Sequence, residues 1–259
     1  MNNRYDHVYL SPHLDDAILS CGSLINKQKR HKESVLIITI FAGIPQKDYK
    51  LSRSISKFIK VSGSRSSTDF CRTRIKEDID AIKLLNISFK HLNFLDAIYR
   101  KNLLGDFFYA NFSKIFSIYA DKSDIVKESI YRVIKGDLKE TSIIYCPISI
   151  GKHIDHIITR QVGNLLESQG QNILFYEDIY TLDYNVNLYL RRYERDLIKY
   201  NKYSVSNNDL IMHERAINCY KTQIKGLIRG TKMSVKGMVR KLNHKLYKNQ
   251  LPYINLWHY

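Results

Sequence analysis

The stretch HVYLSPHLDDAIL, residues 7–19, decides the fold. Residues 7–10 are rich in β-branched and aromatic side chains and are followed by Ser-Pro, which indicates a buried strand. A helix is predicted over residues 16–30, because apolar residues recur there near helical spacing. The continuous apolar run at residues 34–41 is typical of a parallel strand that is covered on both faces. These three segments therefore predict a strand, helix, strand unit.

The same alternation continues along the chain. A polar stretch after residue 43 is expected to be a loop with a short helix. Further strands are expected at residues 91–95, 142–147 and 172–176, and further helices at residues 72–85, 123–134, 153–167 and 212–227. The pattern predicts an α/β fold of Rossmann-like architecture, a mostly parallel sheet flanked by helices. Beyond residue 185 the sequence becomes mainly helical and basic.

Length and composition predict one domain. A chain of 259 residues with 44% hydrophobic composition can bury one large core. We expect a single domain over residues 1–259, with a core of about residues 1–185 and a helical C-terminal extension of about residues 186–259. No apolar run reaches the length of a membrane span, and the opening MNNRYDHVYL lacks the layout of a secretory signal. A cytoplasmic protein is therefore expected, with reduced thiols at its widely spaced cysteines, Cys21, Cys71, Cys146 and Cys219.

The net charge of +16 favours anionic partners, which include nucleic acid, acidic membrane and phosphate-bearing substrates. The alternative is a biased composition that serves solubility. The tail is the most basic region, since nine Lys or Arg and no acidic residue follow from position 221: Lys221, Lys225, Arg229, Lys232, Lys236, Arg240, Lys241, Lys245 and Lys248. Interspersed apolar residues permit peripheral contact with acidic lipid. We favour instead a solvated face whose apolar side packs on the sheet.

Two polar clusters follow predicted buried strands. SPHLDDAILSCG places His13, Asp15 and Asp16 after the first strand, and PISIGKHIDHIITR places His153, Asp155 and His156 after the strand at residues 142–147. Ligands of open α/β sheets bind beyond the carboxyl ends of the strands, so both clusters can face one crevice. Either cluster alone is explained as a polar helix start, but together they supply a set of metal ligands.

Two imidazoles and one carboxylate hold Zn²⁺ or Fe²⁺ with positions left open. His13, Asp16 and His156 provide this set. Such a metal lowers the pKa of bound water toward ~7 and polarises a carbonyl, as amide hydrolysis requires. Asp15 is then the candidate general base, and His153 the candidate cation that stabilises the tetrahedral oxyanion. We expect Asp155 to fix the tautomer of the His153 ring.

At this point the sequence resembles a known family. SPHLDD resembles the PHPDD signature of the PIG-L (LmbE-like) N-deacetylases, and HIDH resembles their HPDH motif. CRTRIKED resembles their Arg-x-x-Glu helix through Arg74 and Glu77, HLNFLDA resembles their strand that ends in Asp, and INCYKTQ resembles their late helix with a Tyr-x-x-Gln core. The five landmarks occur in the same order.

The resemblance implies a zinc-dependent enzyme that removes an acyl group, an acetyl group first of all, from an N-acylated amino sugar. It implies His13, Asp16 and His156 as zinc ligands, Asp15 as the base and His153 as the charged stabiliser. It also implies that Arg74 and Asp96 bind hydroxyl groups of the sugar. For Arg74 the alternative is a salt bridge with Glu77 on the same helix.

The chain departs from the family pattern at three positions. Leu14 and Ala17 stand where the family has Pro and usually Glu, and neither change touches a proposed ligand. Gly151 stands where some members carry a Tyr that helps to polarise the carbonyl. His153, the metal or another tyrosine must then do that work.

Two other functions compete with the deacetylase. One is a basic module that binds nucleic acid or a membrane surface and keeps a vestigial metal site; the other is an amidase acting on a non-sugar amide. No helix-turn-helix, zinc-finger or RNP-like signature supports nucleic-acid binding. The sequence identifies neither the particular sugar, its phosphate or lipid linkage, nor the native metal or the oligomeric state.

Overall fold

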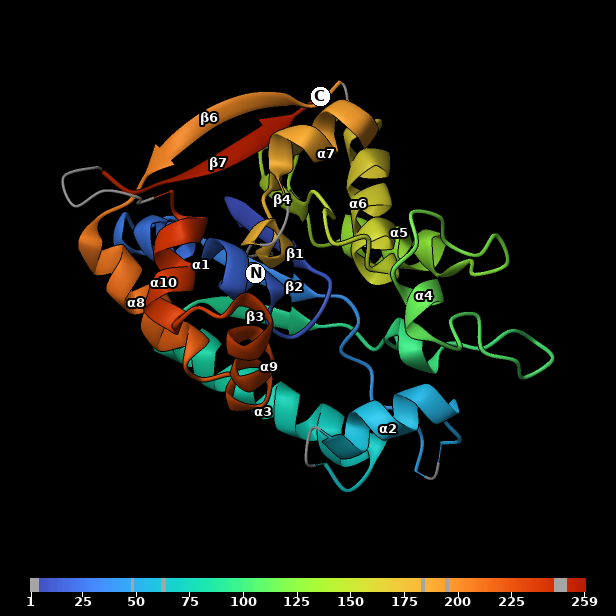
Figure 1. The fold of residues 1–259 in the computed structure, drawn as a ribbon. Coiled ribbons are helices and arrows are strands. Elements are labelled where there is room, and N and C mark those ends of the chain that lie inside the picture. The colour runs from blue at the N-terminus through green and yellow to red at the C-terminus, as the bar shows by residue number, and fades with distance from the viewer. Residues whose placement is uncertain (1–4, 48, 62–63, 183–184, 194–195, 245–250) are drawn as a thin grey trace.

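The computed structural model describes residues 5–47, 49–61, 64–182, 185–193, 196–244 and 251–259. A seven-stranded sheet crosses this part of the chain in the order β3-β2-β1-β4-β5-β7-β6 (Figure 1). The first five of these strands are parallel, β7 is antiparallel to β5, and β6 is antiparallel to β7. The strand bounds are His7–Ser11 (β1), Val35–Thr39 (β2), Ser88–His91 (β3), Ile143–Pro147 (β4), Asn172–Tyr176 (β5), Ile198–Ser204 (β6) and Tyr253–His258 (β7). The predicted α/β class is confirmed.

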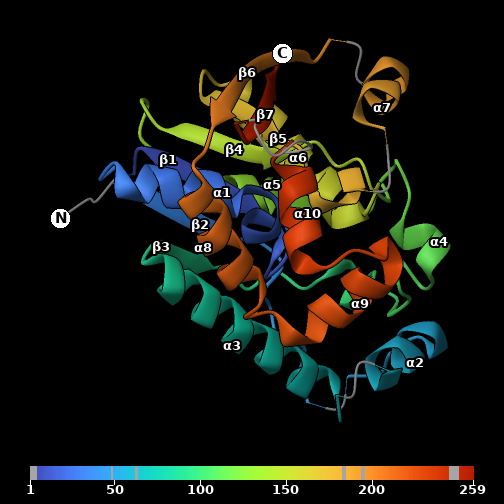
Figure 2. The ribbon, with the colours of Figure 1, turned by 60° about the vertical axis from the view of Figure 1, so that its left-hand side comes forward.

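Helices cover both faces of the sheet (Figures 1 and 2). The helix bounds are Asp16–Arg30 (α1), Arg53–Val61 (α2), Ser67–Leu85 (α3), Phe112–Ile115 (α4), Val126–Lys135 (α5), Ile154–Glu167 (α6), Val186–Tyr193 (α7), Asn207–Ile217 (α8), Lys221–Thr231 (α9) and Val235–Leu242 (α10), with 3-10 turns at Ala97–Tyr99 (η1) and Ile179–Leu182 (η2). None of the helices in the described ranges has the length and apolar character that a membrane span requires.

The core has two layers because successive side chains of a strand point to opposite faces. Val8 and Leu10 of β1 pack in one cluster with residues of α5, α6 and α7. Tyr9 lies on the other face, in a cluster with residues of α1, α3, α8 and α10. All three side chains are fully buried, which explains why the strand contains no polar residue between His7 and Ser11.

Several element boundaries differ from the sequence prediction. The strand predicted at residues 91–95 is wrong, since β3 begins at residue 88, directly after Asn86 ends α3 in the left-handed conformation. The helix α3 starts earlier than predicted because Ser66 caps it by accepting a hydrogen bond from the backbone N–H of Asp69.

The C-terminal region shows the largest differences. The single helix predicted at residues 212–227 is wrong, since the chain turns between α8 and α9, where the buried Tyr220 donates a hydrogen bond to Asp78 of α3 (2.7 Å). The mainly helical C-terminal extension is also corrected, because it contributes β6 and β7 to the sheet. The expectation of one domain over the whole chain stays a prediction.

Close contact between α1 and α8 depends on one glycine. A Cβ placed on Gly22 would lie 2.5 Å from Cδ2 of His213. The His213 ring is fully buried and donates from Nε2 to the carbonyl oxygen of Leu19 (3.1 Å). Burial lowers the pKa of His213 to about 4, so the ring is neutral at pH 7. The ring is therefore held in place and cannot move aside at low cost.

We predict that Gly22→Ala destabilises the fold by about 1–3 kcal/mol, the usual cost of inserting atoms into a packed interior. Urea unfolding followed by circular dichroism measures the change. Gly136→Ala is the matched control, because the nearest atom to its added Cβ would be 4.0 Å away. Equal stability of the two variants would contradict the packing role of Gly22.

Candidate metal centre

The topology brings the two polar clusters to one edge of the sheet. β1 and β4 are neighbouring parallel strands, so the turn that leads from β1 to α1 lies beside the turn that leads from β4 to α6. His13 and Asp15 come from the first turn and Asp16 begins α1, whereas His153 directly precedes α6 and His156 lies at its start. The crevice predicted from the sequence is therefore present.

Three buried side chains converge there. Oδ2 of Asp16 lies 3.0 Å from Nδ1 of His13 and 3.1 Å from Nε2 of His156. One ligand atom from each of the three residues lies within 4.8 Å of the others. Ligands bound tetrahedrally at ~2.0–2.2 Å from a zinc ion are about 3.3–3.6 Å apart, so this donor set fits a divalent metal with little rearrangement.

The electrostatics of the cluster also favour a cation. Burial lowers the pKa of His13, but Asp155 and Asp16 outweigh it and raise that pKa well above its usual value. Burial likewise lowers the pKa of His156, but Asp16 outweighs it and raises the pKa to about 9. The carboxylates thus create a place where positive charge is stabilised, as a divalent ion requires.

In each imidazole, the ring nitrogen that does not face Asp16 lies near a further carboxylate. Nε2 of His13 lies 3.1 Å from Asp155, and Nδ1 of His156 lies 3.6 Å from Asp178. Such partners fix the orientation of metal-binding imidazoles. Asp178 was not predicted from the sequence, although it belongs to an acidic pair that directly follows β5 at the same edge of the sheet.

Asp155 lies elsewhere than the sequence suggested. Its carboxylate contacts His13, the backbone N–H of Ala97 (2.9 Å) and Nη1 of Arg100 (2.6 Å). Burial raises the pKa of Asp155, but Arg100 outweighs it and holds the pKa well below its usual range. The backbone N–H of Asp155, rather than its carboxylate, donates a hydrogen bond to Nδ1 of His153 (3.2 Å).

His153 is neutral in this arrangement. Burial, with His13 beside it, lowers its pKa well below the usual value. Since Nδ1 accepts a hydrogen bond from a backbone N–H, the proton resides on Nε2. The rings of His153 and His13 meet edge to face with centroids 4.8 Å apart, and Phe116 packs edge to face on the other side at 5.2 Å.

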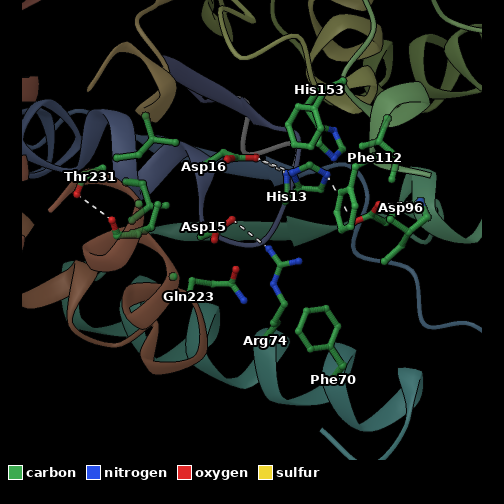
Figure 3. A pocket seen from close by; sticks show the side chains of 18 residues that line it. His13, Asp15, Asp16, Phe70, Arg74, Asp96, Phe112, His153, Gln223 and Thr231 are labelled. Carbon is green, nitrogen blue, oxygen red and sulfur yellow. Dashed lines mark hydrogen bonds and ion pairs between the residues drawn. The ribbon is translucent and has the colours of Figure 1, made fainter. Parts of the chain in front are cut away.

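Asp15 points from the turn into the pocket beside the metal ligands (Figure 3). Its Oδ1 is 3.2 Å from Nη2 of Arg74. Burial raises the pKa of Asp15 to about 6, although Arg74 opposes the shift. A carboxyl group with such a pKa can accept a proton near neutral pH.

The pocket has a volume of about 310 Å³ and also contains Arg74 and Asp96. Asp96 caps η1 and lies 3.6 Å from Nε2 of His13. The alternative salt bridge between Arg74 and Glu77 is absent, because Glu77 accepts hydrogen bonds from the backbone N–H and the hydroxyl of Thr222 (2.9 and 2.6 Å). Arg74 is thus directed toward the pocket rather than along its helix.

Two walls of the pocket were not predicted from the sequence. Phe112 and Phe116 belong to or directly follow α4, a one-turn helix that carries no periodic signal. The opposite wall is one face of α9, with Gln223 and Thr231 among its residues (Figure 3). The Tyr-x-x-Gln landmark pointed to this helix but not to its contact with the pocket.

None of the basic side chains that the structure describes in the tail lines the pocket. In α9 the side chains of Lys225 and Arg229 are exposed and lie about 170° and about 130° around the helix from the centre of the pocket face. Lys232, also exposed, follows the last residue of α9. The apolar side of α10 packs into the core as expected, whereas no residue of α9 is buried. Lys245 and Lys248 lie outside the described residues, and contact of the tail with lipid stays a prediction.

The chain is similar in sequence to known deacetylases. The sequence model described as PIG-L: GlcNAc-PI de-N-acetylase matches residues 8–165, the part that holds both clusters. A 2'-N-acetylparomamine deacetylase from Niallia circulans is 30% identical over 184 residues. That alignment covers 66% of this chain and 66% of the relative, just under two thirds of the relative's length.

Solved structures share the fold. The zinc-inhibited form of teicoplanin deacetylase superposes with a TM-score of 0.77 at 22% identity, covering 97% of this chain and 96% of that chain. The A40926 pseudoaglycone deacetylase superposes with a TM-score of 0.75 at 23% identity, covering 98% and 97%.

We predict that the protein binds about one divalent metal and that His13→Ala and His156→Ala lose it, since each removes one of three ligands. Asp178→Asn should keep the site but weaken metal binding by about 10–100-fold, the usual effect of removing an orienting partner. Titration of the metal-free protein with Zn²⁺, followed by calorimetry, measures both effects. His31→Ala, an exposed histidine far along the chain from either cluster, is the control. Unchanged Zn²⁺ affinity in His13→Ala, His156→Ala and Asp178→Asn would refute the ligand assignment.

Proposed function

The chain belongs to the PIG-L family of GlcNAc-PI de-N-acetylases, and on that premise we propose that it removes an N-acyl group, an acetyl group first of all, from an amino sugar. The observation that carries this proposal is the placement of Asp15. It lies beside a buried set of two imidazoles and a carboxylate, at the base of a pocket, with its pKa raised to about 6. A general base in that position is what hydrolysis of an amide needs.

We propose His13, Asp16 and His156 as the metal ligands, with Zn²⁺ or Fe²⁺ as the metal. When bound, the ion supplies a Lewis acid for the amide carbonyl and a lowered pKa for water. Asp155 and Asp178 hold the two imidazoles in orientation, and both are fully buried. Because a related deacetylase has a zinc-inhibited form, activity should be assayed with several divalent metals.

Asp15 takes the proton from the attacking water. Burial disfavours its charged form and so raises its proton affinity, while Arg74 keeps part of the carboxylate ionised. The carboxylate can therefore accept a proton near neutral pH and release it again later in the reaction. The contact with Nη2 of Arg74 also fixes the direction in which Asp15 points.

His153 stabilises the oxyanion of the tetrahedral intermediate through Nε2. The ring starts neutral, since burial lowers its pKa. The Nε2–H group donates a hydrogen bond to the carbonyl oxygen, and this bond becomes stronger as negative charge develops there. This role agrees with the absence of a tyrosine at Gly151.

Arg74 and Asp96 bind the sugar in this proposal. Both line the pocket within reach of the metal ligands. The Arg74 guanidinium can donate hydrogen bonds to sugar hydroxyl oxygens, and the Asp96 carboxylate can accept hydrogen bonds from sugar hydroxyl groups. The similarity to deacetylases of 2'-N-acetylparomamine and of the A40926 pseudoaglycone supports an amino sugar within a secondary metabolite as the substrate class. We further propose a cytoplasmic location, where reducing conditions keep the four cysteines as thiols.

Asp15→Asn should fold and retain metal but lose activity by about 10²–10⁴-fold, because the amide has nearly the same shape and cannot accept the proton. Acetate release from N-acetyl amino sugars measures activity, and elemental analysis measures metal. Asp80→Asn, on the exposed face of α3, is the control. If Asp15→Asn remains active with normal metal content, a different group is the base.

His153→Ala should lower kcat by about 10²–10³-fold with little change in KM, because the contact matters mainly when the oxyanion forms. Steady-state kinetics on the metal-loaded enzyme separates the two parameters. A rise in KM alone would instead assign His153 to substrate positioning.

A further inference from the structure

The face of α9 that borders the pocket is unusually small and neutral. Its residues are Gln223, Gly226, Leu227, Gly230 and Thr231. Because they follow at spacings of three and four, they form one stripe along the helix. In Figure 3 this helix lies on one side of the pocket, with Arg74 at its base.

The two glycines are not explained by the chain itself. A helical glycine costs about 1 kcal/mol relative to alanine. Neither Gly226 nor Gly230 has a positive φ, and a Cβ on either would meet nothing within 4 Å. Neither backbone conformation nor packing against a neighbouring element therefore requires glycine, and what the glycines provide is room in the pocket.

The opposite wall is aromatic. Phe70 of α3 and Phe112 of α4 line the pocket across from α9 (Figure 3). Phe112 exposes 44% of its surface, a large fraction for a side chain that borders a cavity. An apolar group seated between this ring and the glycine face would bury surface on both of its sides.

Charged groups are confined to the base of the pocket. Arg74 is the one Lys or Arg among the described lining residues, and it already pairs with Asp15. A diphosphate would find no further cationic partner in these walls. The acidic lining residues, Asp15, Asp16 and Asp96, all surround the proposed metal site, so a polycationic substrate would also lack partners farther out.

An independent observation indicates that this pocket takes a ligand. His153 is 8% exposed and lines the same pocket, and its Nε2 has no hydrogen-bond partner within the described part of the chain. Nε2 therefore faces the space of the pocket, where its N–H group can donate a hydrogen bond to a bound molecule.

We propose that the pocket selects an N-acetyl amino sugar joined to an uncharged apolar aglycone, seated between Phe112 and the face of α9 that contains Gly226 and Gly230. This inference rests on the proposed deacetylase function and narrows its substrate class. It excludes nucleoside-diphosphate sugars as the preferred substrates, despite the net charge of +16, because none of the basic side chains of α9 lines the pocket and Arg74 is already paired with Asp15.

The test compares phenyl N-acetylglucosaminide, UDP-N-acetylglucosamine and free N-acetylglucosamine as substrates of the metal-loaded enzyme. The wild type should show the highest kcat/KM for the phenyl glycoside. Gly226→Leu should lower that value about tenfold or more by filling the space of the phenyl ring, and leave the free sugar little changed. Phe112→Ala should show the same selective loss. Lys225→Leu adds the same side chain to the opposite face of α9 and should change neither value.

Thermal unfolding shows whether Gly226→Leu is correctly folded. Because leucine favours a helix more than glycine does, this variant should unfold at or above the wild-type temperature. A wild-type preference for UDP-N-acetylglucosamine, or an equal loss on all three substrates in Gly226→Leu, would overturn the inference. Failure of the proposed function looks different, because no substrate would release acetate with any metal. In that case calorimetry still tests the aglycone site, by comparing the affinity of the phenyl glycoside for the wild type with its affinity for Gly226→Leu. Equal affinities would refute the site.

Discussion

One carboxylate oxygen joins the two halves of the site. Oδ2 of Asp16 accepts a hydrogen bond from the backbone N–H of His13 and lies within 3.1 Å of imidazole nitrogens of both His13 and His156. Asp16 is also the first residue of α1, where the helix dipole favours negative charge. A buried carboxylate without such partners would cost several kcal/mol. The turn after β1, its contact with α6 and the capacity to hold a cation all depend on this one group.

Behind the imidazoles, buried charges alternate in sign. Asp155 contacts His13 and Arg100, and Nε of Arg100 continues to Asp124 at 2.9 Å. Buried ion pairs add little net stability, but loss of one member leaves an uncompensated charge in the interior. The series therefore serves mainly to fix geometry. It links the orientation of the His13 ring to a loop more than twenty residues beyond η1, which explains how a site assembled from separate turns keeps one arrangement.

The sequence predicted the centre of the molecule better than its periphery. His13 and His156 could be placed together because each follows a buried apolar strand, and parallel strands deliver their carboxyl ends to one edge. The break before α9 could not be predicted, because it depends on a hydrogen bond between Tyr220 and the distant α3. Phe112 gave no signal, since a single helical turn has no periodicity. Asp178 could have been predicted as an acidic residue that follows a buried strand. Its contact with His156, however, depends on the tertiary structure.

The strand order has a consequence for how the chain folds. β7 lies between β5 and β6, and β6 pairs with no other strand in the described part of the sheet. During synthesis β6 therefore leaves the ribosome well before β7. Its backbone hydrogen-bonding groups remain unpaired until more than forty further residues have been synthesised. Such non-local pairing slows folding and leaves a strand edge open to other chains in the meantime. The lysine at position 202 of β6 suits this interval, because charge on an unpaired edge discourages pairing between nascent molecules.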